Sequence, residues 1–593
     1  MEKTKQNRKY CGTLRAKDIG TEITVYGWSA RRRDLGQLIF IDLRDRTGLL
    51  QLAFDDSTDK EVFETATTVR GEFVLSAKGV LRERTAKNPE MPTGDVELEV
   101  TQLKILAKSE TPPFEITENS EVNDALRLKY RYLDLRRPDM QKYIALRHKA
   151  VKVVRDYFYE NGFLEIETPI LTKSTPEGAR DYLVPSRVHP GKFYALPQSP
   201  QQYKQLLMLA GFDRYIQIVK CFRDEDLRAD RQPEFTQIDL EMSFVGVEDI
   251  IEINSGFVKR LWKEVLGVEL QSPIPRLTWR EAMDRFGSDK PDIRFGLELC
   301  DISDIVKDCE FKVFSEPVAG GGSVRMIYLP DGGAMPRKQI DSLVEFVKTY
   351  GAKGLAWTKL GEDGSTSSSY SKFLTEEENK KILERAGAMQ GGLILIVADS
   401  KDDIVFASLG ALRCECAKRL ELTKQGDYKF LWITEFPLFE YSEEEARYVA
   451  KHHPFTAPMD EDTDLLETDR VNCRAKAYDL VLNGTELGGG SIRINTPELQ
   501  EKMFKALGFS SQDAQERFGH LINAFKFGAP PHGGIAFGLD RLVMHLAGLG
   551  SIRDVIAFPK VQNASELMTG CPDIVDDMQL TELGLMLDNK GMA

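Results

Sequence analysis

Residues 215–244 constrain the fold most strongly, because they are expected to form two β-strands joined by a charged loop. Side chains alternate across a strand, so two polar sets should each share a face: Arg223 with Glu225, and Gln237 with Asp239 and Glu241. The opposite face of the second strand is apolar and suited to a core: Ile238, Leu240 and Met242. We therefore expect one wet, ionisable face, and its position beside an aromatic residue at a loop mouth favours a ligand site over a solvated hairpin with surface ion pairs.

The chain has 593 residues, 42% of them hydrophobic, which is too long for one core and predicts three or four domains. A net charge of −14 argues against non-specific coating of DNA or RNA, but it leaves room for a local basic face that binds RNA. Eight scattered cysteines without CxxC spacing disfavour zinc and disulfides. Without an apolar leader or a long apolar run, the chain is expected to be cytoplasmic and free of membrane contact.

Residues 1–110 are predicted to form a small all-β domain. Five alternating runs predict its strands: Glu22–Trp28, Gln37–Leu43, Leu49–Phe54, Glu72–Leu81 and Asp95–Ala107. A predicted helix over Asp59–Val69 follows the third strand, which is the element order of an OB barrel. The oligonucleotide-binding face of such a barrel would carry Arg31–Arg33, Phe40 and Gln51. The alternative, a core Phe40 with solubilising arginines, stays open at this point.

The remaining chain reads as one domain interrupted by an insertion. A charged, helical segment at 111–140 suggests a hinge, and the larger domain would occupy 141–291 and resume at 426–570. It should contain a helix at Ile144–Glu160 and then a strand at 162–171, whose Pro169 stops a regular ladder. The glycine-rich insertion at 292–425 should have its own sheet and helices, without identifiable chemistry. The acidic tail at 571–593 is uninformative.

Three polar clusters follow the insertion, and they suggest one site rather than three. Arginines at 223, 493 and 541 suit phosphate and carboxylate groups. Asp479 and Glu486 would repel each other if buried, so a Mg²⁺ ion bound with a nucleotide explains them better than an ion pair does. Gly488–Gly490 lets the backbone approach a ligand closely. P-loop, dinucleotide-binding, GxSxG and HExxH patterns are all missing from the sequence.

These residues resemble the class II aminoacyl-tRNA synthetases and, within subclass IIb, the bacterial-type aspartyl enzymes. Motif 1 is similar to GFLEIETPIL, motif 2 to Phe222–Glu225 followed by RQPEFTQID, and motif 3 to Gly538–Arg541. TPEGARDY, QSPQ, HHPFT and GGGSIR make the resemblance very specific, and it covers nearly the whole chain. It implies a multidomain α/β (α+β) fold with an anticodon-binding OB barrel, a hinge, an antiparallel catalytic sheet and an inserted α+β domain.

The resemblance implies that ATP and L-aspartate form aspartyl-adenylate, from which aspartate passes to the 3′ end of tRNA-Asp. Arg223, Glu486 and Arg541 would be catalytic, and Asp479 with Glu486 would bind Mg²⁺. The implied ATP site consists of Arg223, Asp224, Glu225, Gln232, Phe235, Glu486, Gly538, Leu539, Asp540 and Arg541. The implied aspartate site consists of Glu177, Gln201, Lys204, Arg223, Asp239, His452 and Arg493. His452 is ranked above His453 without a physical reason that separates them.

The resemblance also assigns Arg33, Phe40 and Gln51 to the anticodon, and motif 1 implies a homodimer. Position 35 is Leu, where relatives that also charge tRNA-Asn often carry His, so a tRNA-Asp-specific enzyme is favoured over one of relaxed specificity. An asparagine or lysine enzyme of the same subclass is a further alternative. A non-catalytic RNA-binding paralogue would be expected to lose Arg223, Glu486 or Arg541, and all three are present.

Overall fold

The computed structural model describes residues 8–174, 178–225, 231–443 and 445–587. The chain forms two compact units: Met1–His148 with Leu227–Gln232 and Ser551–Val575, and Lys149–Asp226 with Pro233–Gly550 and Asp576–Ala593. Within the described ranges, no helix has the length and apolar character needed to cross a bilayer.

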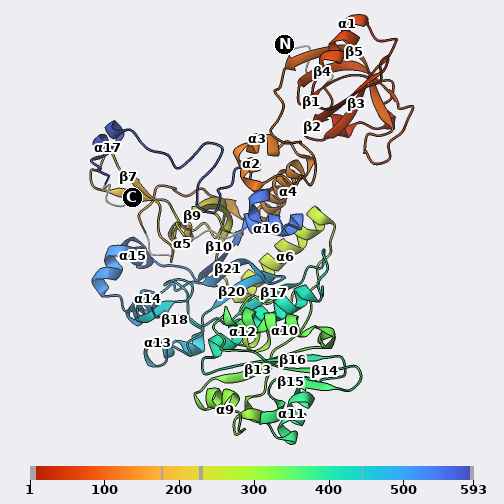
Figure 1. The fold of residues 1–593 in the computed structure, drawn as a ribbon. Helices are drawn as coiled ribbons and strands as arrows, with labels where there is room; N and C mark the ends of the chain where they lie inside the picture. The colour runs from red at the N-terminus through yellow and green to blue at the C-terminus, as the bar shows by residue number, and fades with distance from the viewer. Residues whose placement is uncertain (1–7, 175–177, 226–230, 444, 588–593) are drawn as a thin grey trace. The chain divides into compact units, whose positions relative to one another are not determined.

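The first unit contains a closed five-stranded barrel of order β1-β2-β3-β5-β4 (Figure 1). Its strands are β1 (Glu22–Asp34), β2 (Ile39–Asp45), β3 (Gly48–Phe54), β4 (Val74–Glu83) and β5 (Val96–Ala107). Buried and partly exposed residues alternate along β4, as the sequence pattern predicted. Helix α1 (Lys60–Thr68) follows β3, and the Asp59 carboxylate caps it by accepting the backbone N–H groups of Glu61 and Val62. The predicted OB barrel is confirmed.

The predicted hinge consists of α2 (Asp124–Lys129), α3 (Arg131–Asp134) and the start of α4 (Pro138–Glu160). Proline at the first position of α4 suits the start of a helix, where its missing N–H costs nothing. Several charges of this segment are paired with one another in its interior. Asp134 is completely buried and binds Arg127 at 2.9 Å and Arg137 at 3.0 Å. Arg131 also donates to the carbonyl oxygens of Ile556 and Ala557, which ties α3 to the 551–575 segment of the same unit.

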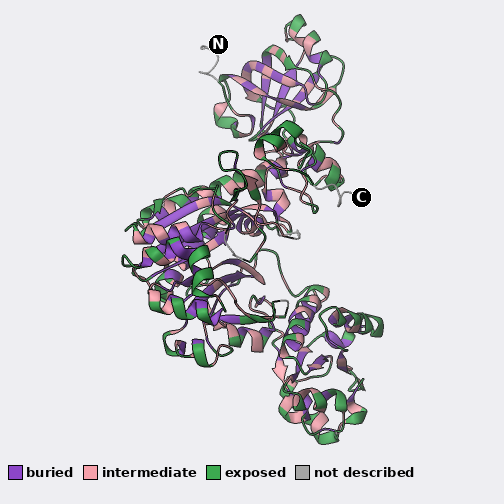
Figure 2. Cartoon of the chain, turned by 90° about the vertical axis from the view of Figure 1, so that its left-hand side faces the viewer, coloured by how far each residue is buried: buried purple, intermediate pink, exposed green. Residues whose placement is uncertain are grey.

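The second unit is built on an eight-stranded sheet of order β11-β17-β20-β21-β22-β10-β9-β6. Its strands are β6 (Leu164–Glu165), β9 (Arg214–Phe222), β10 (Glu234–Ser243), β11 (Arg276–Thr278), β17 (Phe430–Thr434), β20 (Ala477–Leu482), β21 (Thr485–Ile492) and β22 (His532–Gly538). The central strands are antiparallel, and only the β6–β9 and β11–β17 pairs at the two edges are parallel. The strand predicted over 162–171 is reduced to two residues, and it ends four positions before Pro169, so the proline alone does not account for its short length. Figure 2 shows the buried strands in purple.

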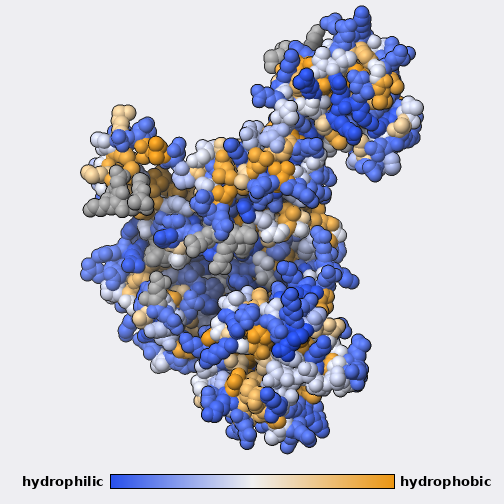
Figure 3. Space-filling model, viewed as in Figure 1, coloured by the Kyte–Doolittle hydropathy of each residue, from blue (hydrophilic) through white to orange (hydrophobic). Residues whose placement is uncertain are grey.

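Helices pack on this sheet and connect its strands: α5 (Gln201–Leu209), α6 (Val247–Leu266), α7 (Trp279–Phe286) and α16 (Leu539–Ala547). Phe257 of α6 packs edge-on against Phe537 of β22, with ring centroids 5.4 Å apart. Aromatic burial of this kind fixes α6 on one face of the sheet. Hydrophilic side chains surround the hollow over β20 and β21 (Figure 3).

The insertion has its own five-stranded sheet of order β12-β13-β16-β14-β15. The strands are β12 (Cys300–Asp301), β13 (Ser323–Leu329), β14 (Ala356–Leu360), β15 (Thr366–Ser368) and β16 (Leu393–Asp399). Helices α10 (Arg337–Lys348) and α12 (Asp402–Arg419) share one apolar cluster with the sheet, and α9 (Lys312–Ala319) and α11 (Glu376–Ala386) share another. The insertion is therefore a layered α+β body.

Candidate active site

The hairpin β9–β10 is the centre of the site, but its ionisable face is not wet as expected. Asp239 and Glu241 are both completely buried. The next strand, β22, is glycine-rich where it pairs with them: Glu241 faces Gly534 in the register, and a Cβ on that glycine would lie 2.0 Å from the Glu241 carboxylate. The two carboxylates occupy the space that larger side chains on β22 would fill. This position shields the carboxylates from solvent.

Two buried cations pair with these two carboxylates. Lys204 of α5 places its Nζ atom 2.7 Å from Asp239 Oδ1 and 3.3 Å from Glu241 Oε2. Arg493, which follows β21, donates from Nε to Glu241 Oε1 at 2.9 Å and from Nη2 to Oε2 at 3.2 Å. A bidentate guanidinium–carboxylate pair holds both groups in a fixed plane. The four side chains form one cluster, which we call the buried charge cluster.

The two carboxylates of the buried charge cluster have pKa values displaced in opposite directions. Burial by itself raises the pKa of Glu241, but Arg493 and Lys204 outweigh it and lower that pKa to about 2. Burial raises the pKa of Asp239 above its ordinary value in spite of Lys204. Glu241 thus holds its negative charge, and Asp239 is the carboxylate that protonates more readily.

His453 contacts the same guanidinium from the opposite side. Arg493 Nη1 lies 2.5 Å from His453 Nε2 and donates to Ser491 Oγ at 2.7 Å. Burial and the neighbouring Arg493 hold the pKa of His453 well below its ordinary value, so the ring is neutral. The backbone N–H of Phe455 also points at His453 Nδ1, at 3.1 Å. A neutral imidazole accepts at only one nitrogen, so it cannot satisfy both donors at once.

His452, the histidine ranked first from the sequence, lies beside this contact. Its ring packs edge-on against Phe436, with centroids 5.0 Å apart. Burial, Lys451 and Arg493 lower its pKa to about 4. The contact with the Arg493 guanidinium is made by His453, and a role of His452 in binding aspartate remains a prediction.

The residues predicted to bind ATP begin where β9 ends. The strand stops at Phe222, so Arg223 and Glu225 lie beyond it and do not share a strand face as expected. Arg223 donates its backbone N–H to the Pro233 carbonyl, and its guanidinium carbon lies 5.1 Å from the centre of the Phe235 ring. Asp224 donates its backbone N–H to the Arg180 carbonyl. The arginine and the aromatic ring expected at the nucleotide are therefore neighbours.

Motif 3 lies at the corner where β22 runs directly into α16. The Asp540 carboxylate accepts the backbone N–H of Thr236 at 2.8 Å and thereby ties α16 to β10. Arg541 donates from Nη1 to the carbonyl oxygen of Glu486 at 2.7 Å, which brings motif 3 to β21. Gly538 is the residue before the helix, and Leu539, the first residue of the helix, is buried.

Asp479 and Glu486 lie on the paired strands β20 and β21, beside Gly489. Asp479 faces Gly489 in the register, and a Cβ on that glycine would lie 2.3 Å from Asp479 Oδ1 and 3.5 Å from Glu486 Oε1. Burial and the charge of Glu486 raise the pKa of Asp479 well above its ordinary value. A carboxylate whose charge is disfavoured by a second carboxylate, around an open cradle, fits a divalent cation. Among the described residues no set of three His, Cys, Asp or Glu forms a metal group, so phosphate or water would complete the coordination.

The other residues predicted for the substrates are placed as follows. Gln201 is buried on α5, one turn before Lys204, and its Nε2 atom has no hydrogen-bond partner in the described part of the chain. Gln232 belongs to the first unit, where its side chain accepts from the Lys560 N–H at 2.7 Å and donates to the Lys560 carbonyl at 3.0 Å. Glu177 lies outside the described residues.

The barrel brings its three predicted nucleic-acid contacts together on the β1–β2–β3 face. Arg33 donates to Gln51 Oε1 at 2.7 Å, and its guanidinium carbon lies 5.5 Å from the centre of the Phe40 ring. Phe40 is only partly buried between the fully buried Ile39 and Ile41, so it faces out of the barrel. This arrangement disfavours the alternative of a core Phe40. Leu35, in the β1–β2 turn, is 69% exposed.

Sequence reasoning missed Glu241, His453 and Ser491 as site residues. The signal for Glu241 was present, because it shares the alternating face of Asp239. Ser491 lies two residues before Arg493, which again is a same-side spacing on a strand. Nothing local distinguished the two adjacent histidines.

Comparison with known proteins assigns this arrangement to a family. A family model described as "tRNA synthetases class II (D, K and N)" matches residues 123–562. The chain belongs to this family. An "OB-fold nucleic acid binding domain" model matches residues 23–106.

Named relatives of this synthetase match it over nearly their whole length. "Aspartate--tRNA ligase" of Ruminiclostridium cellulolyticum is 60% identical over 579 residues, 97% of each chain. "Aspartate--tRNA(Asp/Asn) ligase" of Caldanaerobacter subterraneus subsp. tengcongensis is 59% identical over 580 residues, 98% of each chain. The crystal structure of asparaginyl-tRNA synthetase from Pyrococcus horikoshii complexed with asparaginyl-adenylate covers 93% of this chain and 98% of its own, with a TM-score of 0.57 and 17% identity. At that identity it supports the fold alone.

Proposed function

We propose that this chain ligates L-aspartate to tRNA-Asp, through aspartyl-adenylate formed from aspartate and ATP. The observation that carries the proposal is the buried charge cluster, in which two cations lie at the centre of a class II catalytic sheet. The 60% identity to a full-length relative named aspartate–tRNA ligase supports the same conclusion.

Aspartate would be selected at the guanidinium of Arg493. Glu241 holds the Nε and Nη2 atoms, and Ser491 and His453 lie at Nη1. Because His453 cannot satisfy both of its donors, it is the neighbour that yields most readily to a substrate carboxylate. Asparagine offers an amide in place of the charged group, a loss on the order of 1.5–3 kcal/mol for a hydrogen bond to a charged partner. The carboxylate of aspartate would also meet Lys204.

Activation of aspartate consists of attack by its α-carboxylate on the α-phosphorus of ATP, with pyrophosphate leaving. This step needs positioning and charge neutralisation, and no side chain acts as a nucleophile. Arg223 would bind the α-phosphate and the attacking carboxylate, and Phe235 would stack on adenine. Arg541 would hold the γ-phosphate. In the second step a hydroxyl of the terminal tRNA ribose attacks the aspartyl carbonyl, and AMP leaves.

Asp479 and Glu486 would hold Mg²⁺, whose charge offsets that of the nucleotide phosphates. The open cradle at Gly489 and the raised pKa of Asp479 support this role. Glu486 also orients Arg541 through its backbone carbonyl, so the carboxylate pair and the phosphate-binding arginine are linked.

The barrel would read the anticodon through Arg33, Phe40 and Gln51, and the active form would be a cytoplasmic homodimer. Charging of tRNA-Asn is a second candidate activity, because one relative is named for both tRNAs. The exposed Leu35 favours tRNA-Asp alone. Aminoacylation of tRNA-Asp and tRNA-Asn transcripts in parallel decides between the two.

Arg493→Lys tests the proposed function, because lysine keeps the charge but loses the bidentate geometry. Aspartate-dependent ATP–pyrophosphate exchange should fall about tenfold or more, while the affinity for ATP changes little. Near-normal exchange in this variant would contradict the assignment. Parallel assays of the wild type with asparagine and lysine should show no exchange, and activity with either would support a sister specificity.

A further inference from the structure

The inserted domain is joined to the catalytic sheet by a closely packed neck. Helix α7 ends at Phe286, and residues 287–292 then form what we call the entry loop. At its start, a Cβ on Gly287 would lie 2.4 Å from the Phe406 carbonyl oxygen, and one on Gly410 would lie 2.5 Å from the Gly287 oxygen. The backbones of the entry loop and of α12 thus touch directly, which only glycine permits.

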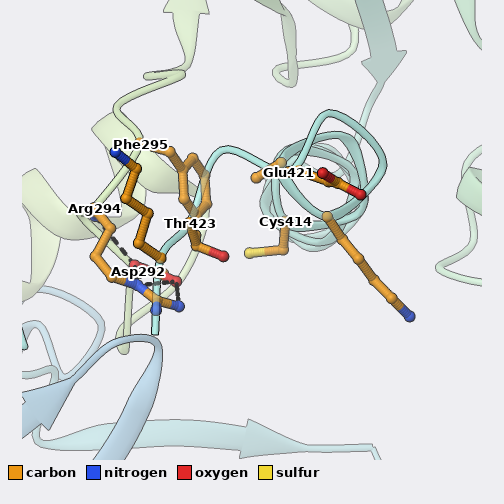
Figure 4. Close-up of a pocket in the computed structure, with 9 residues that line it drawn as sticks. Asp292, Arg294, Phe295, Cys414, Glu421 and Thr423 are labelled. Atoms are coloured by element: carbon orange, nitrogen blue, oxygen red, sulfur yellow. Dashed lines mark hydrogen bonds and ion pairs between the residues drawn. The ribbon is translucent and has the colours of Figure 1, made fainter. Parts of the chain in front are cut away.

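Arg413 of α12 fastens the segment that follows. Its side chain is completely buried and donates to the carbonyl oxygens of Asp292 at 2.8 Å and Leu297 at 3.2 Å. It also lies over the rings of Phe286 and Phe295, 4.9 and 4.5 Å from their centres. Beside it lies an open cavity of about 580 Å³, where Figure 4 shows the Asp292–Arg294 ion pair facing α12. A guanidinium buried among carbonyls and aromatic rings locks the position of the loop.

The entry loop runs along the proposed phosphate end of the active site. A Cβ on Gly484, in the β20–β21 turn, would lie 3.3 Å from the Cβ of Asp292. Gly484 lies two residues before Glu486, and Lys290 lies two residues before Asp292, so this contact brings Lys290 to the carboxylate pair; the charges of Asp289 and Lys290 also act on Asp479. Arg294 acts in the same way on His545, one turn beyond Arg541 on α16. The loop therefore reaches the carboxylate pair, and Arg294, just beyond the loop, reaches the helix of motif 3.

Lys290 is the cation of this loop that remains available for a ligand. Its side chain is exposed, and among the described residues its ammonium group has no hydrogen bond or ion pair, although its backbone N–H donates to Ser288 Oγ at 3.2 Å. The other cations nearby are engaged: Arg294 binds Asp292 at 2.6 Å, and Lys451 lies 3.4 Å from Glu440. A lysine beside a carboxylate pair that holds a cation is suited to the oxygens of a polyphosphate.

We propose that Lys290 binds the β- and γ-phosphates of ATP, and pyrophosphate in the reverse reaction, and that the inserted domain positions it through Arg413. The inference rests on the proposed function. It gives the insertion a defined part in the chemistry: α12 holds the entry loop so that its lysine reaches the departing phosphates. The lysine contributes charge neutralisation only, and no bond to it is made or broken.

Lys290→Ala tests the proposal in the full-length protein by aspartate-dependent ATP–pyrophosphate exchange. The KM values for ATP and pyrophosphate should each rise about tenfold or more, as expected for loss of one charge-assisted hydrogen bond. The KM for aspartate should stay within about twofold, and Lys290→Arg should restore most of the loss. Calorimetric titration with Mg-ATP alone provides a second readout, with a matching rise in Kd.

The matched control is Lys338→Ala, which removes an exposed lysine on α10 of the inserted domain. It should leave every constant unchanged. An ATP KM and Kd that do not change in Lys290→Ala, with an active wild type, would overturn the inference. A wild type without aspartate-dependent exchange would instead refute the proposed function, so the two failures are distinguishable.

A double-mutant cycle tests the positioning role of Arg413. Arg413→Met should raise the KM for ATP, and adding Lys290→Ala in that background should raise it less than about twofold further. Fully additive effects would show that Arg413 does not act through Lys290. If Arg413→Met fails to fold by circular dichroism, Arg413→Lys takes its place, since it keeps the charge but cannot span the same carbonyls.

Discussion

Replacing Glu241 by glutamine should uncouple the buried charge cluster while keeping the shape of the side chain. The pKa of Glu241 is lowered from 4.5 to about 2 by Arg493 and Lys204. That difference corresponds to about 3 kcal/mol of stabilisation at neutral pH. The same range follows from the cost of breaking one partner of a buried ion pair, about 3–5 kcal/mol.

The sign of the pH dependence follows from the lowered pKa. A carboxylate whose folded pKa lies below its unfolded value stabilises the fold above the unfolded value, and it loses that effect as the pH falls towards the folded one. For Glu241 the window runs from 4.5 down to about 2. Between pH 7 and pH 4 the difference between wild type and variant should therefore shrink by about 1 kcal/mol.

Hydrogen exchange of the backbone amides of β10 measures this locally, because a chain of several domains does not unfold in one step. At pH 7 the Glu241→Gln variant should exchange these amides about a hundredfold faster than the wild type. Glu252→Gln, on the exposed side of α6, is the matched control and should change nothing. Two results would refute the predicted role of Glu241. One is a variant exchange rate within about threefold of the wild-type rate at pH 7, and the other is a difference between the two rates that does not narrow at pH 4.

Two further predictions concern the metal cradle and the histidine pair. Gly489→Ala places a methyl group 2.3 Å from Asp479 Oδ1, so pyrophosphate exchange at limiting Mg²⁺ should fall about tenfold or more, and an unchanged Mg²⁺ titration would argue against the cradle. His453→Ala should change the KM for aspartate more than His452→Ala does, because His453 touches Arg493; equal effects of the two substitutions would contradict this assignment.

Much of the fold could be predicted because its signals are local. Alternating residues define the barrel strands, and Asp59 caps the helix that was expected after the third one. Motif 3, which lies at the β22–α16 corner, was also recognisable from a short pattern. The strand over 162–171 was overestimated, because the length of an edge strand depends on how far it pairs with its one neighbour, here β9.

The site was harder to predict from the sequence, because its contacts join segments that are far apart in the chain. Motif 3 predicts that Asp540 contacts the nucleotide, yet its carboxylate accepts a hydrogen bond from a backbone N–H of β10. Arg413 lies in a segment without any polar cluster, and its partners are more than a hundred residues earlier in the chain. No local pattern separates His452 from His453, since only the packing of Phe436 and Arg493 gives them different neighbours.

The amino-acid sequence determines which chemical groups this protein brings to its substrates: the arginines, the carboxylate pair and the glycine-rich strands, because residue type and strand alternation are local properties. The tertiary structure alone decides their charge and exposure. Glu241 and Arg493 are 252 residues apart, and their contact turns a face expected to be wet into a buried ion pair. Burial and charge pairing depend on what covers a residue, and that is settled only when the strands and helices pack together.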